Sequence, residues 1–297
     1  MQYRFKHKGK IPSLTDGLLE SYTHTPTGME HIDYAELPSR SEMINVINGL
    51  MSLLFPGYFG PKRPDRENLP FFTGARLDQI YEILAVQIFM GLRHRCRGDL
   101  SSCGNCETLA EDITCAFLKE LPKIRQILAT DVEAAWRGDP AAKSFDEIIY
   151  CYPGLFAISL YRMANYLHKA GSLILPRFMT EHAHSKTGCD IHPGATIGDE
   201  FFIDHATGVV IGETTIIGKN VRIYQGVTLG SLRFPKDKDG NLLRDQKRHP
   251  TLEDDVIVYA GATILGADTT IGKGAVIGGN TWITKSVEPG AKIILKQ

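Results

Sequence analysis

The sequence predicts an α+β protein in which an N-terminal all-helical domain precedes a C-terminal left-handed parallel β-helix of hexapeptide repeats. Two observations predict this fold class. Helical apolar stripes run through the first half of the chain, and from about residue 190 an aliphatic residue recurs at every sixth position instead. We expect the domains to span residues 1–185 and 186–297, with a polar excursion loop at 232–247.

The helical half carries apolar residues at spacings of three and four, which place them on one face of a helix. The clearest stripes run from residue 43 to 54, after a potential N-cap at Ser39 or Ser41, and from residue 77 to 90. Similar stripes cover residues 107–120, 122–137 and 155–168. Residues 1–38 mix Thr, Gly, Pro and charged residues without a sustained period, so we expect an irregular arm there.

The second half is an internal repeat of six residues. Two extra residues are inserted into the repeat before Ile211. A polar segment then interrupts the repeat, and the six-residue register starts again at Val258. The aliphatic positions are Ile191, Ile197, Ile203, Ile211, Ile217, Ile223, Leu229, Val258, Ile264, Ile271, Ile277 and Ile283. Each unit is a short strand and a turn, so the aliphatic side chains stack in a central column, as in a parallel β-helix. An ordinary β-sandwich is the structural alternative.

Composition excludes several classes of protein. The chain has 297 residues, 43% hydrophobic and 23% charged, which is typical of a globular protein and not of a disordered, collagen or coiled-coil chain. A formal net charge of −1 without a dense Lys/Arg block argues against nucleic acid and membrane surfaces as partners. No apolar run approaches the roughly 20 residues of a membrane span, and the start lacks an apolar signal-peptide core. With only six unevenly placed cysteines, we expect a cytoplasmic protein without disulfides.

Polar residues interrupt the repeat where a purely structural coil does not need them. Asp204-His205 coincides with the two-residue insertion, and Arg248-His249-Pro250 closes the excursion loop. Loops that leave a rigid scaffold are where function concentrates. Other polar residues within the repeats are Asp190, Glu213 and Gln225, of which the last two can equally satisfy turn backbone.

Seven segments carry a family resemblance. Within the repeats they are Asp190-Ile-His-Pro-Gly-Ala, Ile203-Asp-His-Ala-Thr-Gly, Val210-Ile-Gly-Glu-Thr, Tyr224-Gln-Gly-Val-Thr-Leu-Gly and Arg248-His-Pro-Thr-Leu. Upstream they are Arg137-Gly-Asp-Pro-Ala-Ala and Tyr152-Pro-Gly-Leu-Phe-Ala. Together these segments, which cover about residues 130–285, resemble the serine acetyltransferases of cysteine biosynthesis. The resemblance implies transfer of the acetyl group of acetyl-CoA to the hydroxyl of L-serine, giving O-acetyl-L-serine and CoA.

The histidines fit that chemistry. A serine hydroxyl is a poor nucleophile at neutral pH, so it needs a general base, and a histidine can accept a proton there. We predict His205 as this base, with the Asp190 carboxylate accepting the other ring N–H and fixing the tautomer, a role that the resemblance also implies. By resemblance, His249 is a second active-site histidine.

L-serine carries an ammonium and a carboxylate, so a selective site needs both anionic and cationic side chains, a charged cage. By resemblance, Asp139 and Asp204 bind the ammonium of serine, and Arg248 can grip its carboxylate with two hydrogen bonds. An aspartate before a proline, such as Asp139, is also typical of a turn or cap. The family's acetyl-CoA groove runs along the β-helix, and the small residues that match it are Gly230, Ala260 and Gly261, although tight turns alone would also favour them. Basic residues of the excursion loop can meet the phosphates of CoA or stay solvated.

The resemblance also implies an assembly and a regulator. It implies a homotrimer or a dimer of trimers, and feedback inhibition by L-cysteine, which carries the same ammonium and carboxylate as serine. The ending after Val287 lacks the long tail ending in isoleucine with which the family docks into O-acetylserine sulfhydrylase, which argues against that complex.

Three alternatives stay open. A hexapeptide acyltransferase acting on another small amine or alcohol would keep His205 as base but would not need the charged cage. A zinc enzyme of the γ carbonic anhydrase type would bind zinc across a subunit interface and could use His192, His205 and His249. A scaffold whose coil only assembles subunits is disfavoured by the acid-base and charge pattern.

A structural metal site is a further possibility in the helical half. Its potential ligands are Cys96, Cys103, Cys106, Cys115 and His94. A second metal-type pair of cysteines is missing, so we expect reduced, unligated cysteines and no metal requirement.

Overall fold

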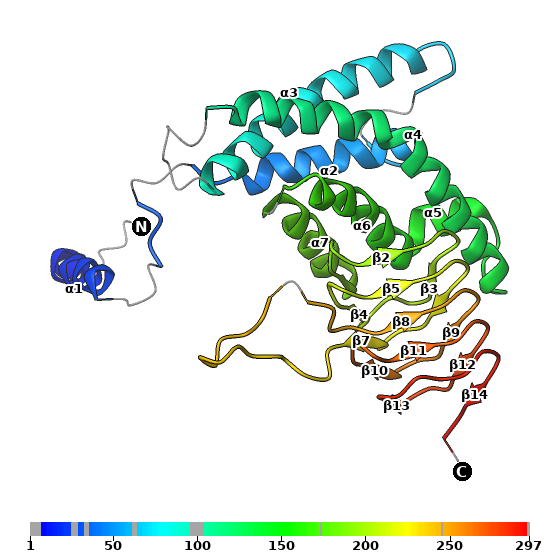
Figure 1. Cartoon of the computed structure of the whole chain (residues 1–297). Helices are drawn as coiled ribbons and strands as arrows, with labels where there is room; N and C mark the ends of the chain where they lie inside the picture. The colour runs from blue at the N-terminus through cyan, green and yellow to red at the C-terminus, as the bar shows by residue number, and fades with distance from the viewer. Residues whose placement is uncertain are drawn as a thin grey trace.

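The computed structural model describes residues 7–24, 29–32, 36–60, 64–95, 104–172, 174–244 and 246–295. Its helices are η1 (Lys8–Lys10), α1 (Ile11–Thr23), α2 (Arg40–Leu54), α3 (Leu69–Arg95), α4 (Cys106–Gly138), α5 (Phe145–Cys151), α6 (Pro153–Lys169) and α7 (Ile174–Thr187). Helices α2 to α7 are stacked on one end of a coil of short strands, and α1 lies apart from them (Figure 1). The predicted α+β fold class, with a left-handed parallel β-helix after a helical region, is confirmed.

The coil has three sides, each a parallel sheet. The first sheet has the order β1-β4-β7-β10-β13, the second β11-β8-β5-β2 and the third β14-β12-β9-β6-β3. The strands are β1 (Asp190–Ile191), β2 (Thr196–Ile197), β3 (Phe202–Ile203), β4 (Val210–Ile211), β5 (Ile216–Ile217), β6 (Arg222–Ile223), β7 (Thr228–Gly230), β8 (Thr251–Leu252), β9 (Ile257–Val258), β10 (Thr263–Leu265), β11 (Thr270–Ile271), β12 (Val276–Ile277), β13 (Trp282–Ile283) and β14 (Lys292–Ile293).

The six-residue repeat produces the predicted central column. Repeat positions pair in register from coil to coil, for example Ile191 with Ile211 and Ile211 with Leu229. Most of these side chains are buried. The coil resumes after the excursion loop at β8, whose Leu252 pairs with Ile217, and so one repeat earlier than the sequence pattern placed it. The reason is that Leu252 is followed by Glu253 and not by the glycine that marks most other repeats.

Helices α2, α3, α4 and α6 follow the predicted apolar stripes, with one difference in α4, whereas α5 and α7 lie where no stripe was predicted. Ser39 caps α2 by accepting a hydrogen bond from the Glu42 amide at 3.3 Å, as one of the two predicted caps. The stripes at 107–120 and 122–137 belong to one helix, α4, which continues through Pro122. Both halves bury the same face in the core, and that packing outweighs the single backbone hydrogen bond that a proline removes.

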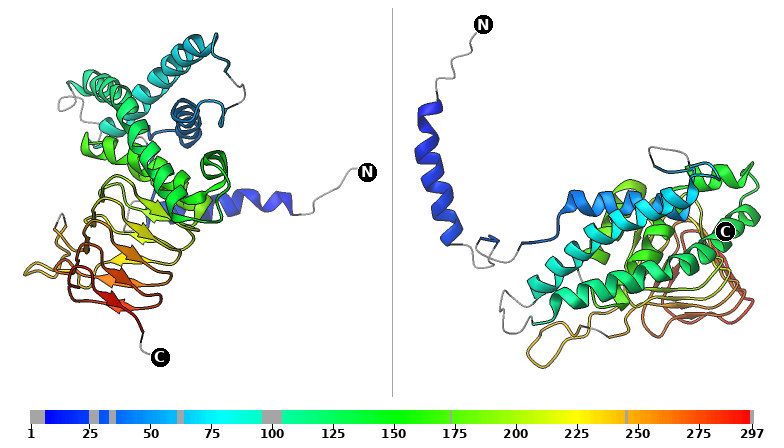
Figure 2. Two further views of the ribbon diagram at one scale, coloured as in Figure 1. Left: turned by 90° about the vertical axis from the view of Figure 1, so that its right-hand side faces the viewer. Right: turned by 90° about the horizontal axis from the view of Figure 1, so that it is seen from above.

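The expectation of an irregular arm is wrong for residues 8–23. These residues form η1 and α1, which stand apart from the other helices and have no buried residue (Figures 1 and 2). The apolar spacing Ile11, Leu14, Leu18 and Tyr22 is helical, and Pro12 occupies a first-turn position where proline is tolerated. The mixed composition of the segment concealed this short stripe.

A buried ion pair joins the helices to the coil. Arg162 on α6 donates to both carboxylate oxygens of Asp131 on α4, at 2.6 and 2.7 Å. The same carboxylate accepts the backbone N–H of Phe201 at 2.9 Å, and Arg162 donates to the carbonyl of Gly198 at 2.9 Å. Because both side chains are almost fully buried, every charge-bearing atom needs these partners.

Two glycines let helix ends approach the coil closely. A Cβ on Gly138, the last residue of α4, would lie 2.7 Å from the Phe202 ring. A Cβ on Gly154, at the start of α6, would lie 2.1 Å from the carbonyl oxygen of Ile203. These contacts bring the ends of two helices to the turn that follows β3. None of the helices within the described ranges has a stretch long and apolar enough to cross a bilayer.

Replacement of Asp131 by Asn tests the buried pair. The variant keeps the side-chain shape but leaves the Arg162 guanidinium buried without a counter-charge, so we expect a loss of about 3–5 kcal/mol in the free energy of unfolding. Urea unfolding at fixed protein concentration measures it. Lys123→Ala, which removes the exposed pair with Glu120, is the control and should leave the midpoint unchanged. Equal midpoints for both variants would contradict the assignment.

Candidate functional site

The residues predicted to form one site lie at two corners of the coil. One corner is the turn between β3 and β4 together with the end of α4. We call it the His205 corner, and it contains Asp139, Tyr152, Asp204 and His205. At the other corner, the turn after β4 meets the segment that precedes β8. We call it the His249 corner, and it contains Glu213, Thr214, Arg248 and His249. The first sheet separates the two corners, because β4 runs from one to the other.

At the His205 corner, the two inserted residues form a tight turn. His205 and Ala206 adopt left-handed conformations, with φ of 59° and 67°. Such conformations are rare outside glycine, and they often mark functional positions. The His205 side chain is 69% exposed, and its Nε2 lies 3.8 Å from Oδ2 of Asp204. The turn therefore presents the imidazole to solvent and not to the core.

Two carboxylates lie beside this histidine. Asp139 accepts hydrogen bonds from the Tyr152 hydroxyl at 2.5 Å and from the Ala141 amide at 2.8 Å, and these bonds lower the pKa of the Asp139 carboxyl. Burial raises the pKa of Asp204, an effect that the charge of His205 opposes and that of Asp139 reinforces. Asp139 thus caps the turn after α4, as its position before Pro140 allowed, and it also contributes a negative charge to this corner.

Tyr152 is a site residue that sequence reasoning did not assign. Burial and the Asp139 carboxylate raise its pKa, so the hydroxyl stays protonated and donates to Asp139. It appears in the sequence only as the first residue of a motif, without a spacing that connects it to Asp139.

Asp190 is not in contact with His205 in the described part of the chain. It begins β1, and its nearest charged partner is Arg177, whose Nη1 lies 3.8 Å from Oδ1. This oxygen is sealed from solvent and has no hydrogen-bond partner among the residues that the structure describes. The orienting role of Asp190 stays a prediction, and the exposure of His205 leaves its ring free to change rotamer.

The residues of the two metal-binding alternatives do not gather in one place within the described part of a single chain. Among the described residues, Glu181, His184 and Asp190 are the one group spaced closely enough to hold an ion, and Arg177 already pairs with two of them. His205 lies at a different corner from His192 and His249. Cys96 and Cys103 lie outside the described residues; Cys106 is buried and Cys115 exposed.

The His249 corner combines a cation with a buried imidazole. Arg248 donates from Nη2 to Glu213. Burial tends to raise the pKa of Glu213, but the hydrogen bond from Arg248 and the nearby His192 outweigh it and lower the pKa. Burial, reinforced by the Arg248 charge, lowers the pKa of His249 to about 4. The His249 ring is therefore neutral at neutral pH.

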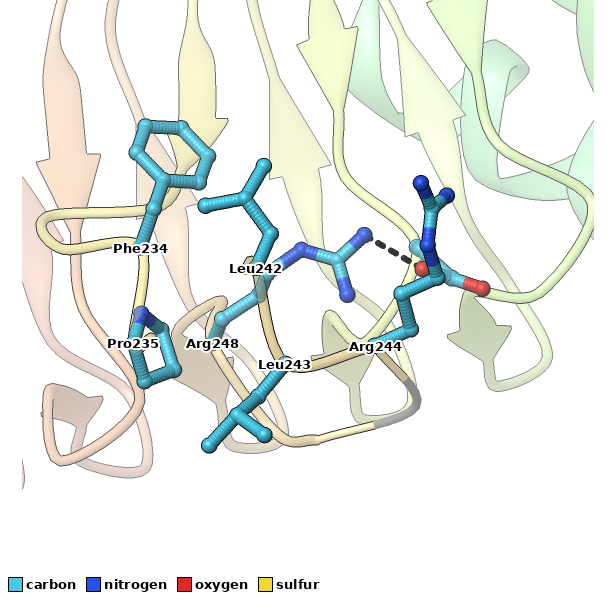
Figure 3. Close-up of a pocket in the computed structure, with 7 residues that line it drawn as sticks. Phe234, Pro235, Leu242, Leu243, Arg244 and Arg248 are labelled. Atoms are coloured by element: carbon cyan, nitrogen blue, oxygen red, sulfur yellow. Dashed lines mark hydrogen bonds and ion pairs between the residues drawn. The ribbon is translucent and has the colours of Figure 1, made fainter. Parts of the chain in front are cut away.

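The excursion loop forms two cavities beside Arg248. One, of about 270 Å³, has apolar walls from Phe234, Pro235 and Leu242, with Arg244 and Arg248 among its lining residues (Figure 3). The other cavity, of about 340 Å³, shares Pro235 with the first as a lining residue, and its other lining residues include Arg233, Lys247 and Gly266. Apolar walls beside basic groups suit a ligand that has both an apolar part and anionic groups.

The small residues predicted for the CoA groove are also divided. Gly230 ends β7 at the corner that carries the loop, whereas Ala260 and Gly261 lie in the turn between β9 and β10, on the same edge of the coil as His205. Gly226 and Gly261 both have positive φ and lie against each other, so their lack of side chains serves the stacked turns. Gln225, another candidate, stabilises this stack through its backbone carbonyl, which accepts the Gly261 amide. Its side-chain oxygen is buried and has no hydrogen-bond partner within the described ranges.

Comparison with known proteins gives the family. No family model matches the chain. A plasmid-encoded serine acetyltransferase of Synechococcus elongatus is 48% identical over 260 residues, which cover 86% of this chain and 81% of that protein. The chain belongs to the serine acetyltransferase family. A Mycobacterium tuberculosis serine acetyltransferase is 46% identical over 55% of this chain and 67% of its own length.

Solved structures agree with this assignment. Serine acetyltransferase 1 of Entamoeba histolytica, in complex with L-cysteine, matches with a TM-score of 0.71 and 34% identity over 97% of this chain and 98% of that one. Isoform 3 from the same organism, also in complex with cysteine, matches with a TM-score of 0.71 and 32% identity over 97% and 93%. This family uses acetyl-CoA as its co-substrate.

Gly212→Ala tests the packing of His249. A Cβ at this position would lie 2.1 Å from Cδ2 and 2.2 Å from Nε2 of the imidazole, so the ring must move. A displacement of about 1 Å can cost about 10²-fold in rate, and we expect a loss of this size in kcat/KM for serine acetylation. Gly74→Ala in α3, where a Cβ meets nothing within 4 Å, is the control. Wild-type kcat/KM in Gly212→Ala would show that the ring position is unimportant.

Proposed function

We propose that this chain transfers the acetyl group of acetyl-CoA to the hydroxyl of L-serine, giving O-acetyl-L-serine and CoA, the first step of cysteine biosynthesis from serine. The observation that carries the proposal is the 48% identity to a serine acetyltransferase over most of both chains. The two corners supply the groups that this reaction needs: an exposed imidazole, carboxylates for an ammonium, and a guanidinium for a carboxylate.

The complete site requires two copies of the chain. In one copy the first sheet separates Asp204 and His205 from Arg248 and His249. The His205 corner carries Asp139 and Asp204, whereas the His249 corner carries Arg248 and Lys247 against the single carboxylate of Glu213. Complementary patches on opposite edges of one protomer favour a head-to-tail contact that closes into a ring. We therefore propose a homotrimer with the site between neighbours, either alone or paired as a dimer of trimers.

His205 acts as the general base in this proposal. It accepts the serine hydroxyl proton as the oxygen attacks the thioester carbonyl carbon; the new C–O bond forms, the C–S bond breaks, and the proton passes to the sulfur of CoA. Asp139 and Asp204 hold the substrate ammonium, and Arg248 holds the carboxylate after exchanging its contact with Glu213. Asp190 orients the His205 ring when the exposed side chain turns toward it.

The remaining assignments concern the ligands and partners. Gly230, Ala260 and Gly261 line the acetyl-CoA groove, and the loop cavities accept its apolar arm and phosphates. A base and hydrogen-bond donors suffice for transfer from a thioester, so we propose that no metal is required. L-cysteine competes with serine for the same charged cage. A cytoplasmic location stays a prediction from the sequence.

An acetyl-CoA thiol-release assay tests the function. L-serine is compared with homoserine, threonine, ethanolamine and glucosamine at equal concentrations. The proposal expects serine to have the highest kcat/KM, because homoserine has a longer hydroxyl arm and ethanolamine and glucosamine lack the carboxylate that Arg248 binds. Threonine keeps all three groups of serine, so its kcat/KM measures the cost of the extra methyl beside the hydroxyl. A preference for an amino sugar or a simple amine would favour the alternative acyltransferase and overturn the proposal.

His205→Ala tests the base. We expect a folded protein whose kcat falls by about 10² to 10⁴, the usual contribution of a general base, because the exposed side chain makes no core contact. Circular dichroism checks the fold. The control is His24→Ala, which changes an exposed histidine just after α1. A folded His205→Ala protein with near wild-type kcat would rule out this mechanism.

A further inference from the structure

Thr214 contacts both residues of the Arg248-His249 pair. Its Oγ1 accepts the backbone N–H of Arg248 at 2.9 Å and that of His249 at 3.1 Å. The same oxygen lies 2.9 Å from Nδ1 of the His249 ring, and the backbone N–H of Thr214 donates to Nδ1 at 3.1 Å. One residue of the turn after β4 therefore binds the backbone and the ring of His249 together.

These contacts determine where the ring proton lies. A backbone N–H can only donate, so Nδ1 must be the acceptor in the contact with the Thr214 amide. The hydroxyl oxygen of Thr214 already accepts two N–H groups, which leaves its own hydrogen to be donated to Nδ1. A proton on Nδ1 would face both of these hydrogens. The neutral ring therefore carries its proton on Nε2.

The surroundings oppose a second proton. The charged and titratable groups that face His249 are Arg248, Glu213, Lys247 and His192. Glu213 is engaged by Arg248, and Lys247 donates to the Thr214 carbonyl at 2.6 Å, so two cations remain close to the ring. Gly212 packs against the ring, and a Cβ at this position would lie 2.1 Å from Cδ2. Protonation would add a positive charge beside both cations.

We infer that Thr214 is a positioning residue that fixes His249 as a neutral Nε2–H donor, so that His249 serves as a hydrogen-bond donor to substrate oxygen and not as a second base. Among the described residues Nε2 has no hydrogen-bond partner, which leaves its N–H for a ligand. Such a donor stabilises the serine carboxylate or the negative charge that develops on the thioester oxygen. This catalytic consequence rests on the proposed function, whereas the protonation state of the ring does not.

Thr214→Val and Thr214→Ser separate positioning from folding. Valine removes the hydroxyl at nearly constant shape, and serine keeps it. We expect Thr214→Val to lose about tenfold or more in kcat/KM for serine, the equivalent of one hydrogen bond, while Thr214→Ser stays close to wild type. In the valine variant Nδ1 loses a donor and becomes easier to protonate, so the acid limb of the pH profile should move to higher pH.

The ring state is read directly from the imidazole ¹⁵N spectrum of histidine-labelled protein, with His249→Asn identifying the signal. The wild type should show one neutral Nε2–H tautomer from pH 6 to 8, whether or not serine is its substrate. An Nδ1–H tautomer, or titration of His249 in this range, would overturn the inference even if Thr214→Val fails to fold. A Thr214→Val protein with wild-type kcat/KM and pH profile would also overturn it. Lack of serine acetylation by the wild type would instead refute the proposed function and leave the ring assignment to the spectrum.

Discussion

The aliphatic column of the coil is the constraint on which the rest of the structure depends. Each strand has only two or three residues, so no strand pair is stable by itself, and the coil holds together because its inward side chains stack without interruption from Ile191 to Ile277. Side chains outside this column lie on the outer face of a strand, as Asp190 does in β1, or in a turn. Most of the predicted site residues lie in turns, so the order of the turns decides which of them share a corner.

The helical half supplies what the coil lacks. The turn after β3 contains Asp204 and His205, but the second carboxylate of this corner, Asp139, comes from the helical half. The buried pair of Asp131 and Arg162 joins two helices to the first circuit of the coil, and Gly138 allows the end of α4 to reach it. Asp139 follows directly, so its carboxylate depends on a contact made eight residues earlier in the same helix.

The sequence predicted whatever depends on local periodicity. The six-residue period predicted the coil, and the apolar spacings of three and four residues predicted the main helices. Both patterns show which side chains face a core. The sequence missed α1, whose stripe faces no core within the chain, and it divided α4 at Pro122, where packing overrides a local preference. Polar partners distant along the chain were equally hidden. Tyr152 and Asp139, or Thr214 and His249, meet only because of how the chain is folded.

The division of the site between two corners is the central claim, and mixed assemblies test it most directly. His205→Ala and Arg248→Ala chains with different tags are co-expressed, and assemblies containing both are purified and assayed at serine concentrations below KM. If neighbouring copies share each site, one interface of a mixed trimer joins an intact His205 corner to an intact His249 corner, and activity should return to about one site in three. Mixed assemblies no more active than the two variants measured apart would contradict the claim and place all of the catalytic groups within one chain.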